Sequence, residues 1–174
     1  MLSVKMQDAL NAQINAEMWS AYLYLSMSMA AADKGLKGVA NWFAIQFKEE
    51  QDHAQIFINY VLSRGGRVLL EPIAAVDTEW DSALAMFEQT LTHEKKVTSL
   101  INDLYNLAIE EKDHATRSML TWFIDEQVEE EESARDKIFA VEAVEGNKYG
   151  MYQLDKELAA RVYTQASPLA KSAE

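Results

Sequence analysis

Two sets of polar residues recur at the same spacing in this chain. Each set has a carboxylate, a second polar residue 33 positions later, and a third one three positions after that. The sets are Glu17, Glu50 and His53, and then Glu94, Gln127 and Glu130. The second set is the first one moved along the chain by 77 positions. Both sets lie within helical patterns, so the repeat indicates two similar helical hairpins that bring their polar residues to one place.

The hydrophobic pattern predicts an all-α chain. Apolar residues recur at steps of three and four in four long segments, which is the period of amphipathic helices. The six polar residues fall in register with the apolar stripe of their own helix, so they should face inward. No segment carries the alternation that is typical of a strand. We expect helices at about residues 3–32, 38–63, 81–111, 113–145 and 148–160, followed by a tail at 161–174.

The connections between these helices predict their topology. Gly35 and the pair Lys112-Asp113 mark short links, which place consecutive helices antiparallel. The stretch from Arg64 to Trp80 has no helical period, and its 17 residues can extend over about 55 Å. A helix of about 27 residues is only about 40 Å long, so this linker can cross the full length of a bundle. The expected fold is one domain over residues 1–174, a ferritin-like four-helix bundle with one long crossover and a short fifth helix.

The numbers of residues between the polar side chains and the two turns support this arrangement. Glu17 lies 18 residues before Gly35, and His53 lies 18 residues after it. Glu94 and Glu130 lie at the same separation from Lys112. Because helices rise 1.5 Å per residue, all four should present these side chains at one height of the bundle.

Composition limits the classes of function. The formal charge of −12 disfavours nucleic acids and anionic membranes as partners, because both are negatively charged. The chain has no cysteine, which excludes disulfides, thiolate metal sites and cysteine catalysis. The hydrophobic fraction of 49% argues against disorder, and no stretch approaches the roughly 18 consecutive apolar residues of a membrane helix. The N-terminus lacks the apolar core of a signal peptide, so a cytoplasmic protein is expected.

The six inward-facing polar side chains have the chemistry of a metal site. Carboxylates are rarely buried without a partner, since an unpaired buried charge is costly. The four glutamates carry four negative charges, which two divalent cations balance, and oxygen ligands with one imidazole and no sulfur suit iron or manganese. Glu50 and His53 are three residues apart and so point the same way from adjacent turns. Taken singly, such residues can instead set helix register or be hydrogen-bonded core residues.

A second acidic group should lie beside the first. Its members each precede a predicted ligand by one residue: Glu49, Glu126 and Glu129. One residue rotates a side chain by about 100° around a helix, so these three should face the side of the bundle next to the site. A third ion could bind there. For Glu129, which stands in the acidic run at 129–132, a solvated surface is the alternative.

Aromatic and imidazole side chains near the site have two interpretations each. Tyr24 lies seven residues, or two helical turns, after Glu17. Its phenol could bond a ligand carboxylate or donate an electron, and an ordinary core tyrosine is the alternative. Trp122 is a second potential electron donor, although core packing explains it better. His93 and His114 are expected to be solvated.

With these motifs the chain resembles the ferritins, and most closely the bacterial non-haem ferritins, over about residues 3–160. The resemblance rests on Glu17 and on three motifs, EEQDH at 49–53, THEKK at 92–96 and DEQVEEEE at 125–132. It implies a hollow homo-oligomer of 24 subunits that oxidises Fe(II) with dioxygen or hydrogen peroxide and stores ferric mineral inside.

The resemblance also implies roles for individual residues. The first iron site of the family corresponds to Glu17, Glu50, His53 and Glu94. The second iron site corresponds to Glu94, Gln127 and Glu130. The third site of bacterial members corresponds to Glu49, Glu126 and Glu129, and the tyrosine beside the centre to Tyr24. Two iron ions per subunit, with room for a third, are therefore expected.

Several positions depart from related patterns. Bacterioferritins have a histidine at the position of Glu130 and a haem-ligating methionine directly after the second glutamate, where this chain has Gln51. No haem is therefore expected. Animal ferritins often line an iron channel with acidic residues ten and seven positions before the glutamine, but this chain has Arg117 and Leu120 there. Iron should accordingly enter by another pore.

A rubrerythrin-like di-iron peroxidase or oxidase without storage is the alternative function. Such proteins usually carry a rubredoxin module, which needs the cysteines that this chain lacks. A non-catalytic bundle with a structural metal is a third interpretation. Dodecameric mini-ferritins fit less well, because their ligands lie between subunits and this chain carries a full set.

Overall fold

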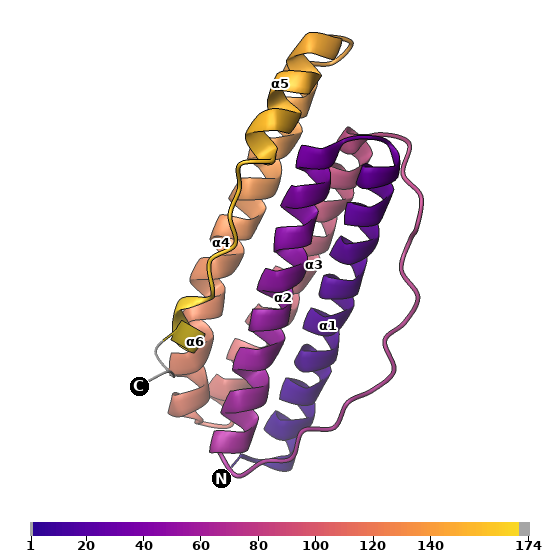
Figure 1. Cartoon of the computed structure of the whole chain (residues 1–174). Coiled ribbons are helices and arrows are strands. Elements are labelled where there is room, and N and C mark those ends of the chain that lie inside the picture. The colour runs from indigo at the N-terminus through magenta and orange to yellow at the C-terminus, as the bar shows by residue number, and fades with distance from the viewer. Residues whose placement is uncertain (1, 171–174) are drawn as a thin grey trace.

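Six helices form in the computed structural model, which describes residues 2–170. Four long helices lie side by side as a bundle: α1 (Val4–Asp33), α2 (Lys37–Ser63), α3 (Ala83–Glu110) and α4 (His114–Ala143) (Figure 1). The shorter α5 (Lys148–Leu158) packs near the start of α2, and α6 (Ser167–Ala170) is a single turn. Within the described residues, no helix combines the length and the apolar character that crossing a bilayer requires.

The expected all-α bundle with a short additional helix is confirmed, and the helix ends differ from the predicted bounds by no more than two residues. Some of these differences arise because the predicted bounds include residues that cap the helices from outside. The side chains of Ser3, Ser82 and Asp113 each accept a hydrogen bond from a backbone N–H three residues later, at 3.1 Å. Such N-caps stand just outside their helices. The short helix α6 lies in the stretch predicted as a tail, whose residues 171–174 are outside the described residues.

Each of the two short links turns at a residue in the left-handed region of backbone space. Gly35 has a φ of +78° and follows the last turn of α1. Lys112 has a φ of +54° and separates α3 from α4, which is less common for a residue with a Cβ. After each of them, a backbone N–H bonds a carbonyl five residues back, at 3.0 Å for Leu36 and 2.9 Å for Asp113. The links therefore make α1–α2 and α3–α4 two antiparallel hairpins.

The crossover from α2 to α3 has no regular secondary structure, yet its backbone is bonded to α1. Four α1 side chains donate hydrogen bonds to crossover carbonyls, in the same order along both segments, at 2.7–3.4 Å. The pairs are Asn11 with Arg67, Asn15 with Glu71, Trp19 with Ala75 and Ser26 with Asp77. The chain thus follows the length of α1 (Figure 1), as expected for one long crossover.

The core consists of two apolar clusters with a polar layer between them. One cluster, which includes Trp42, Phe43 and Phe87, lies toward the α1–α2 link. The other, which includes Phe57 and Phe123, lies toward the opposite end of the bundle. On every long helix, the predicted ligands fall between the residues of these two clusters. The polar side chains are therefore enclosed at mid-height by apolar packing above and below.

Candidate metal centre

Three side chains of the first hairpin meet in the middle of the bundle. Glu17 of α1 and Glu50 and His53 of α2 each offer one ligand atom, and these atoms lie within 4.8 Å of one another. The Nδ1 atom of His53 is 3.3 Å from Oε2 of Glu50. All three residues are at most 3% exposed. Among the described residues, this is the one group of three or more His, Asp or Glu side chains that converges in this way.

The second hairpin contributes the facing half of the layer. The side-chain amide of Gln127 donates to Oε2 of Glu94 at 3.1 Å. The hydroxyl of Tyr24 donates to the other carboxylate oxygen of Glu94. Glu130 is also buried and accepts a hydrogen bond from the amide of Gln46 at 2.9 Å. The two hairpins therefore place hydrogen-bonded carboxylates opposite each other across the bundle.

The carboxyl groups of this layer share a low-dielectric environment. Burial raises the pKa of Glu50 well above its usual value, and the charges of Glu94 and Glu130 raise it further. Burial, then the charge of Glu94, raises the pKa of Glu130 to about 8. Burial also raises the pKa of Glu17 well above its usual range, and the charge of Glu50 adds to this shift. Glu130 therefore retains its proton near neutral pH unless a cation takes the place of the proton, and Glu17 and Glu50 hold their protons more tightly than an exposed glutamate does.

Two buried oxygen atoms in the layer show that its donors and acceptors are unbalanced. The amide of Gln13 donates to Oε1 of Glu17 at 2.8 Å. When the carboxyl groups of the layer are ionised, no N–H or O–H group of the described residues donates to Oε2 of Glu17, and the same holds for Oε1 of Gln46. Buried acceptors without donors are costly, and a metal ion satisfies them. The side chains present therefore fit a bound cation.

The predicted second acidic group surrounds a pocket next to this layer. The pocket has a volume of about 220 Å³, and its lining residues are Glu49, Glu126, Glu129, Glu130, Ser133 and Arg161. Oε1 of Glu126 lies 4.0 Å from Nε2 of His53. Glu129 is exposed, whereas Glu49 and Glu126 are half-buried. Burial raises the pKa of Glu49, and the nearby Arg161 opposes that shift. The structure thus brings all three glutamates to one pocket that adjoins the centre.

The aromatic candidates both touch the centre and belong to the core. Tyr24 bonds Glu94 and also stacks on Phe43, with 6.0 Å between ring centroids. The indole of Trp122 meets the ring of His53 edge to face at 5.6 Å. Tyr24 therefore orients a candidate ligand directly, and Trp122 holds the imidazole of another.

The prediction that His114 is solvated is confirmed, because this side chain is exposed. The prediction that His93 is solvated is wrong. Its imidazole packs on Trp19, with 5.1 Å between ring centroids, and its Nε2 lies 2.7 Å from the hydroxyl of Ser20. Burial lowers the pKa of His93 to about 4, and the charge of Lys96 contributes. The imidazole is neutral because α1 covers this side of α3.

Three polar residues at or beside the centre were not assigned to the site from the sequence. Gln13 and Gln46 each stand one helical turn before a glutamate of the site, on the same buried stripe. A buried amide one turn from a ligand was therefore a usable signal. Arg161 follows α5 in a segment without helical period, so no pattern pointed to it.

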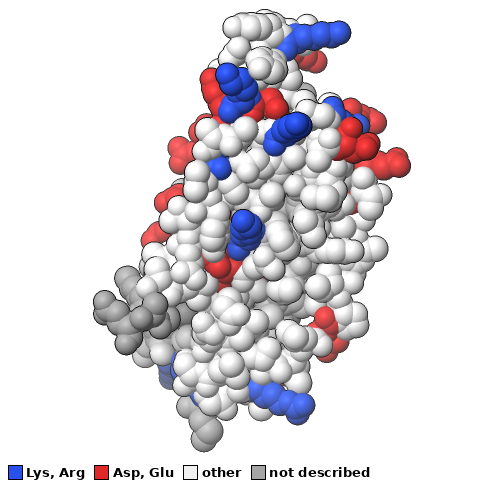
Figure 2. Space-filling view, viewed as in Figure 1, with Lys and Arg blue, Asp and Glu red and all other residues white. Residues whose placement is uncertain are grey.

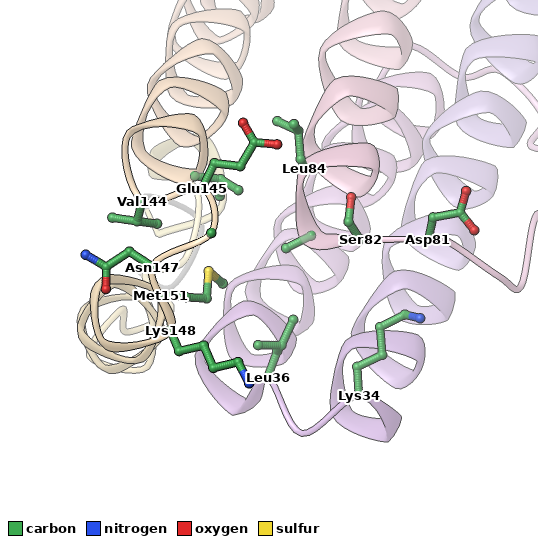
Figure 3. A pocket seen from close by; sticks show the side chains of 13 residues that line it. Lys34, Leu36, Asp81, Ser82, Leu84, Val144, Glu145, Asn147, Lys148 and Met151 are labelled. Carbon is green, nitrogen blue, oxygen red and sulfur yellow. The ribbon is translucent and has the colours of Figure 1, made fainter.

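A separate cavity of about 440 Å³ lies where α4 turns into α5 (Figure 3). Its lining comes from the α1–α2 link, the start of α3 and the α4–α5 junction, and includes Leu36, Leu84, Val144 and Met151. None of the predicted ligands borders it. It marks the seam where α5 packs on the bundle, at a distance from the polar layer.

Known proteins resemble this chain over nearly its full length. Residues 7–142 match the family model described as a Ferritin-like domain. The bacterial non-heme ferritin of Bacteroides fragilis (strain 638R) is 39% identical over 161 residues, which cover 92% of this chain and 100% of the relative. That of Staphylococcus saprophyticus is 38% identical over 166 residues, covering 95% of this chain and 99% of the relative.

Solved structures give the same result at higher identity. An open-pore ferritin from the hyperthermophilic archaeon Archaeoglobus fulgidus is 46% identical, with a TM-score of 0.92, and the match covers 93% of this chain and 100% of that one. A humanized archaeal ferritin is also 46% identical, with a TM-score of 0.93 and coverage of 94% and 99%.

Proposed function

The chain belongs to the ferritin family, and on that premise we propose that it oxidises Fe(II) at the buried centre and stores the ferric product in a hollow homo-oligomeric shell. One observation carries the proposal: the ligand atoms of Glu17, Glu50 and His53 lie within 4.8 Å of one another inside the core. Relatives named bacterial non-heme ferritin support iron as the substrate.

Each hairpin supplies one half of a di-iron site. Glu17, Glu50 and His53 bind the first ion, and Gln127 and Glu130 bind the second. Glu94 lies between the two ions. The amide N–H of Gln127 is engaged by Glu94 at 3.1 Å, which leaves its carbonyl oxygen for a metal. Four carboxylates balance two Fe(II) ions in charge, and hard oxygen ligands suit iron in both oxidation states.

The reaction needs positioning and charge balance more than acid–base catalysis by the protein. Each Fe(II) gives up one electron. Dioxygen takes two electrons and two protons to become hydrogen peroxide, or hydrogen peroxide takes two electrons and two protons to become two waters. Tyr24 holds the carboxylate of Glu94 in place through its hydrogen bond. Glutamates whose pKa values burial has raised release their protons when the ions bind.

The pocket lined by Glu49, Glu126 and Glu129 is the proposed place of a third ion. It shares Glu130 with the centre, so an ion there would lie directly beside the second iron. A neighbouring cation site of this kind would also offer ferric iron a path out of the buried layer.

The test of oxidation is stopped-flow absorbance of the ferric product after Fe(II) is mixed with the air-equilibrated protein. His53→Ala and Glu50→Ala should each slow the initial phase by more than the roughly 10- to 100-fold that loss of a metal-orienting partner costs. His114→Ala removes an exposed imidazole and serves as the matched control. Wild-type initial rates in both site variants would refute the assignment.

The test of storage is the mass of the native particle. A shell of 24 chains of 19.7 kDa each has a mass of about 473 kDa. A monomer or dimer at micromolar concentration in mild buffer would contradict the shell and leave the oxidation centre standing.

A further inference from the structure

The segment that follows α5 lies against the bundle next to the acidic pocket. Figure 1 shows it returning between α4 and α2 toward the middle of the bundle. Asn41 of α2 donates to the carbonyl of Arg161 at 3.0 Å. Farther along α2, Asp52 accepts hydrogen bonds from the hydroxyl of Tyr163 at 2.7 Å and from the backbone N–H of Ala166 at 2.9 Å. The segment is therefore attached to α2 on both sides of the pocket.

Arg161 holds its guanidinium in the wall of this pocket. One end, Nη2, lies 2.7 Å from Oε2 of Glu49. The other, Nη1, donates to the carbonyl of Trp42 at 3.2 Å, and the guanidinium lies 4.9 Å from the centroid of the Trp42 ring. The side chain is 27% exposed. A charge, a backbone acceptor and an aromatic face thus fix one cation in one place.

Arg161 places a positive charge where the third ion would bind. A guanidinium carries a delocalised positive charge. Glu49 is the side chain that the third ion would need from α2, while Glu126 and Glu129 come from α4. A metal ion that approached Glu49 would meet both an occupied carboxylate oxygen and a like charge.

We propose that Arg161 is the resident cation of the acidic pocket and that a third metal ion binds Glu49 only when the Arg161 side chain leaves. The inference rests on the proposed function, because it concerns access to a position beside the di-iron centre. It makes the C-terminal segment a competitor for that position: with the segment in place, two ions bind tightly, and with the guanidinium removed, three ions bind.

The test is anaerobic calorimetric titration of the assembled metal-free protein with Zn(II), which is not oxidised, followed by Fe(II). Wild-type protein should bind two ions per chain tightly. Arg161→Gln should bind a third ion at least tenfold more tightly than the wild type does. Arg161→Lys keeps the positive charge but loses the planar fork, and it should bind the third ion less tightly than Arg161→Gln does. Arg135→Gln removes an exposed arginine whose partner is Glu131 of the same helix, and it should match the wild type.

A double variant shows where any extra ion binds. Arg161→Gln combined with Glu49→Gln should return to two tight ions per chain. Equal affinity for a third ion in the wild type and Arg161→Gln would overturn the inference and leave the di-iron centre intact. Fewer than two tight ions in the wild type would overturn the proposed centre and this inference with it.

Discussion

Replacing Glu130 with glutamine should stabilise the metal-free protein, and the gain should increase with pH. Burial and the charge of Glu94 raise the pKa of Glu130 from 4.5 to about 8. Below pH 4.5 this carboxyl is protonated in both the folded and the unfolded state and costs nothing. As the pH rises toward 8, the unfolded chain ionises freely while the folded protein must hold the proton, so stability is lost. Glutamine keeps an oxygen that accepts the bond from Gln46.

The magnitude follows from the same shift. One pKa unit corresponds to about 1.4 kcal/mol. The penalty that the substitution removes is then below about 1 kcal/mol at pH 5, about 3 kcal/mol at pH 7 and close to 5 kcal/mol above pH 8. For a chain of this size, 1 kcal/mol moves the midpoint of thermal unfolding by roughly 2–4 °C. The variant should therefore unfold roughly 6–12 °C above the wild type at pH 7.

The assay is thermal unfolding of chelator-treated protein at pH 5, 7 and 8, at one protein concentration and one scan rate. Glu132→Gln is the matched control, because it removes the same charge from an exposed position on the same helix. Its effect should be small and similar at all three pH values. A gain for Glu130→Gln that is equal at pH 5 and pH 8 would refute the reasoning.

Two further substitutions test other parts of the structure. In Gly38→Ala the new Cβ would lie 1.6 Å from the backbone carbonyl oxygen of Asp155, so α5 must move away. Limited proteolysis with mass spectrometry should then show faster cleavage within α5. An unchanged cleavage pattern would contradict this contact. Burial raises the pKa of Glu94, and the hydrogen bond that Tyr24→Phe removes opposes that shift. Anaerobic Fe(II) affinity should then fall about three- to tenfold at pH 6.5 and by less at pH 8, whereas a loss of equal size at both pH values would count against this role.

The inward orientation of the site residues was predictable because the apolar stripe of a helix fixes the direction in which each of its other side chains points. Once the apolar stripe of α2 is placed, Glu50 and His53 can only face inward, and both are buried. The same argument holds for Glu94, Gln127 and Glu130. The helix ends were predicted less well, since a cap such as Ser82 depends on backbone angles that periodicity does not report.

Contacts between helices and with aperiodic segments could not be predicted in this way. His93 stands next to an inward residue, and its phase alone does not show that Trp19 and Ser20 of α1 cover it. Arg161 and Glu49 are 112 positions apart. One of them lies in a stretch with no period, so neither spacing nor pattern could pair them.

The crossover has a consequence for how the two halves of the centre meet. Residues 64–82 are the covalent link between the hairpins, and long links without secondary structure are usually slack or functional. Here the crossover is held along α1. From Asn11 to Ser26, α1 side chains donate hydrogen bonds to crossover carbonyls in the same order along both segments. The start of α3 is thereby set at a defined distance along α1. A stretch of irregular chain acts as a rigid spacer that sets the axial register between two ligand sets.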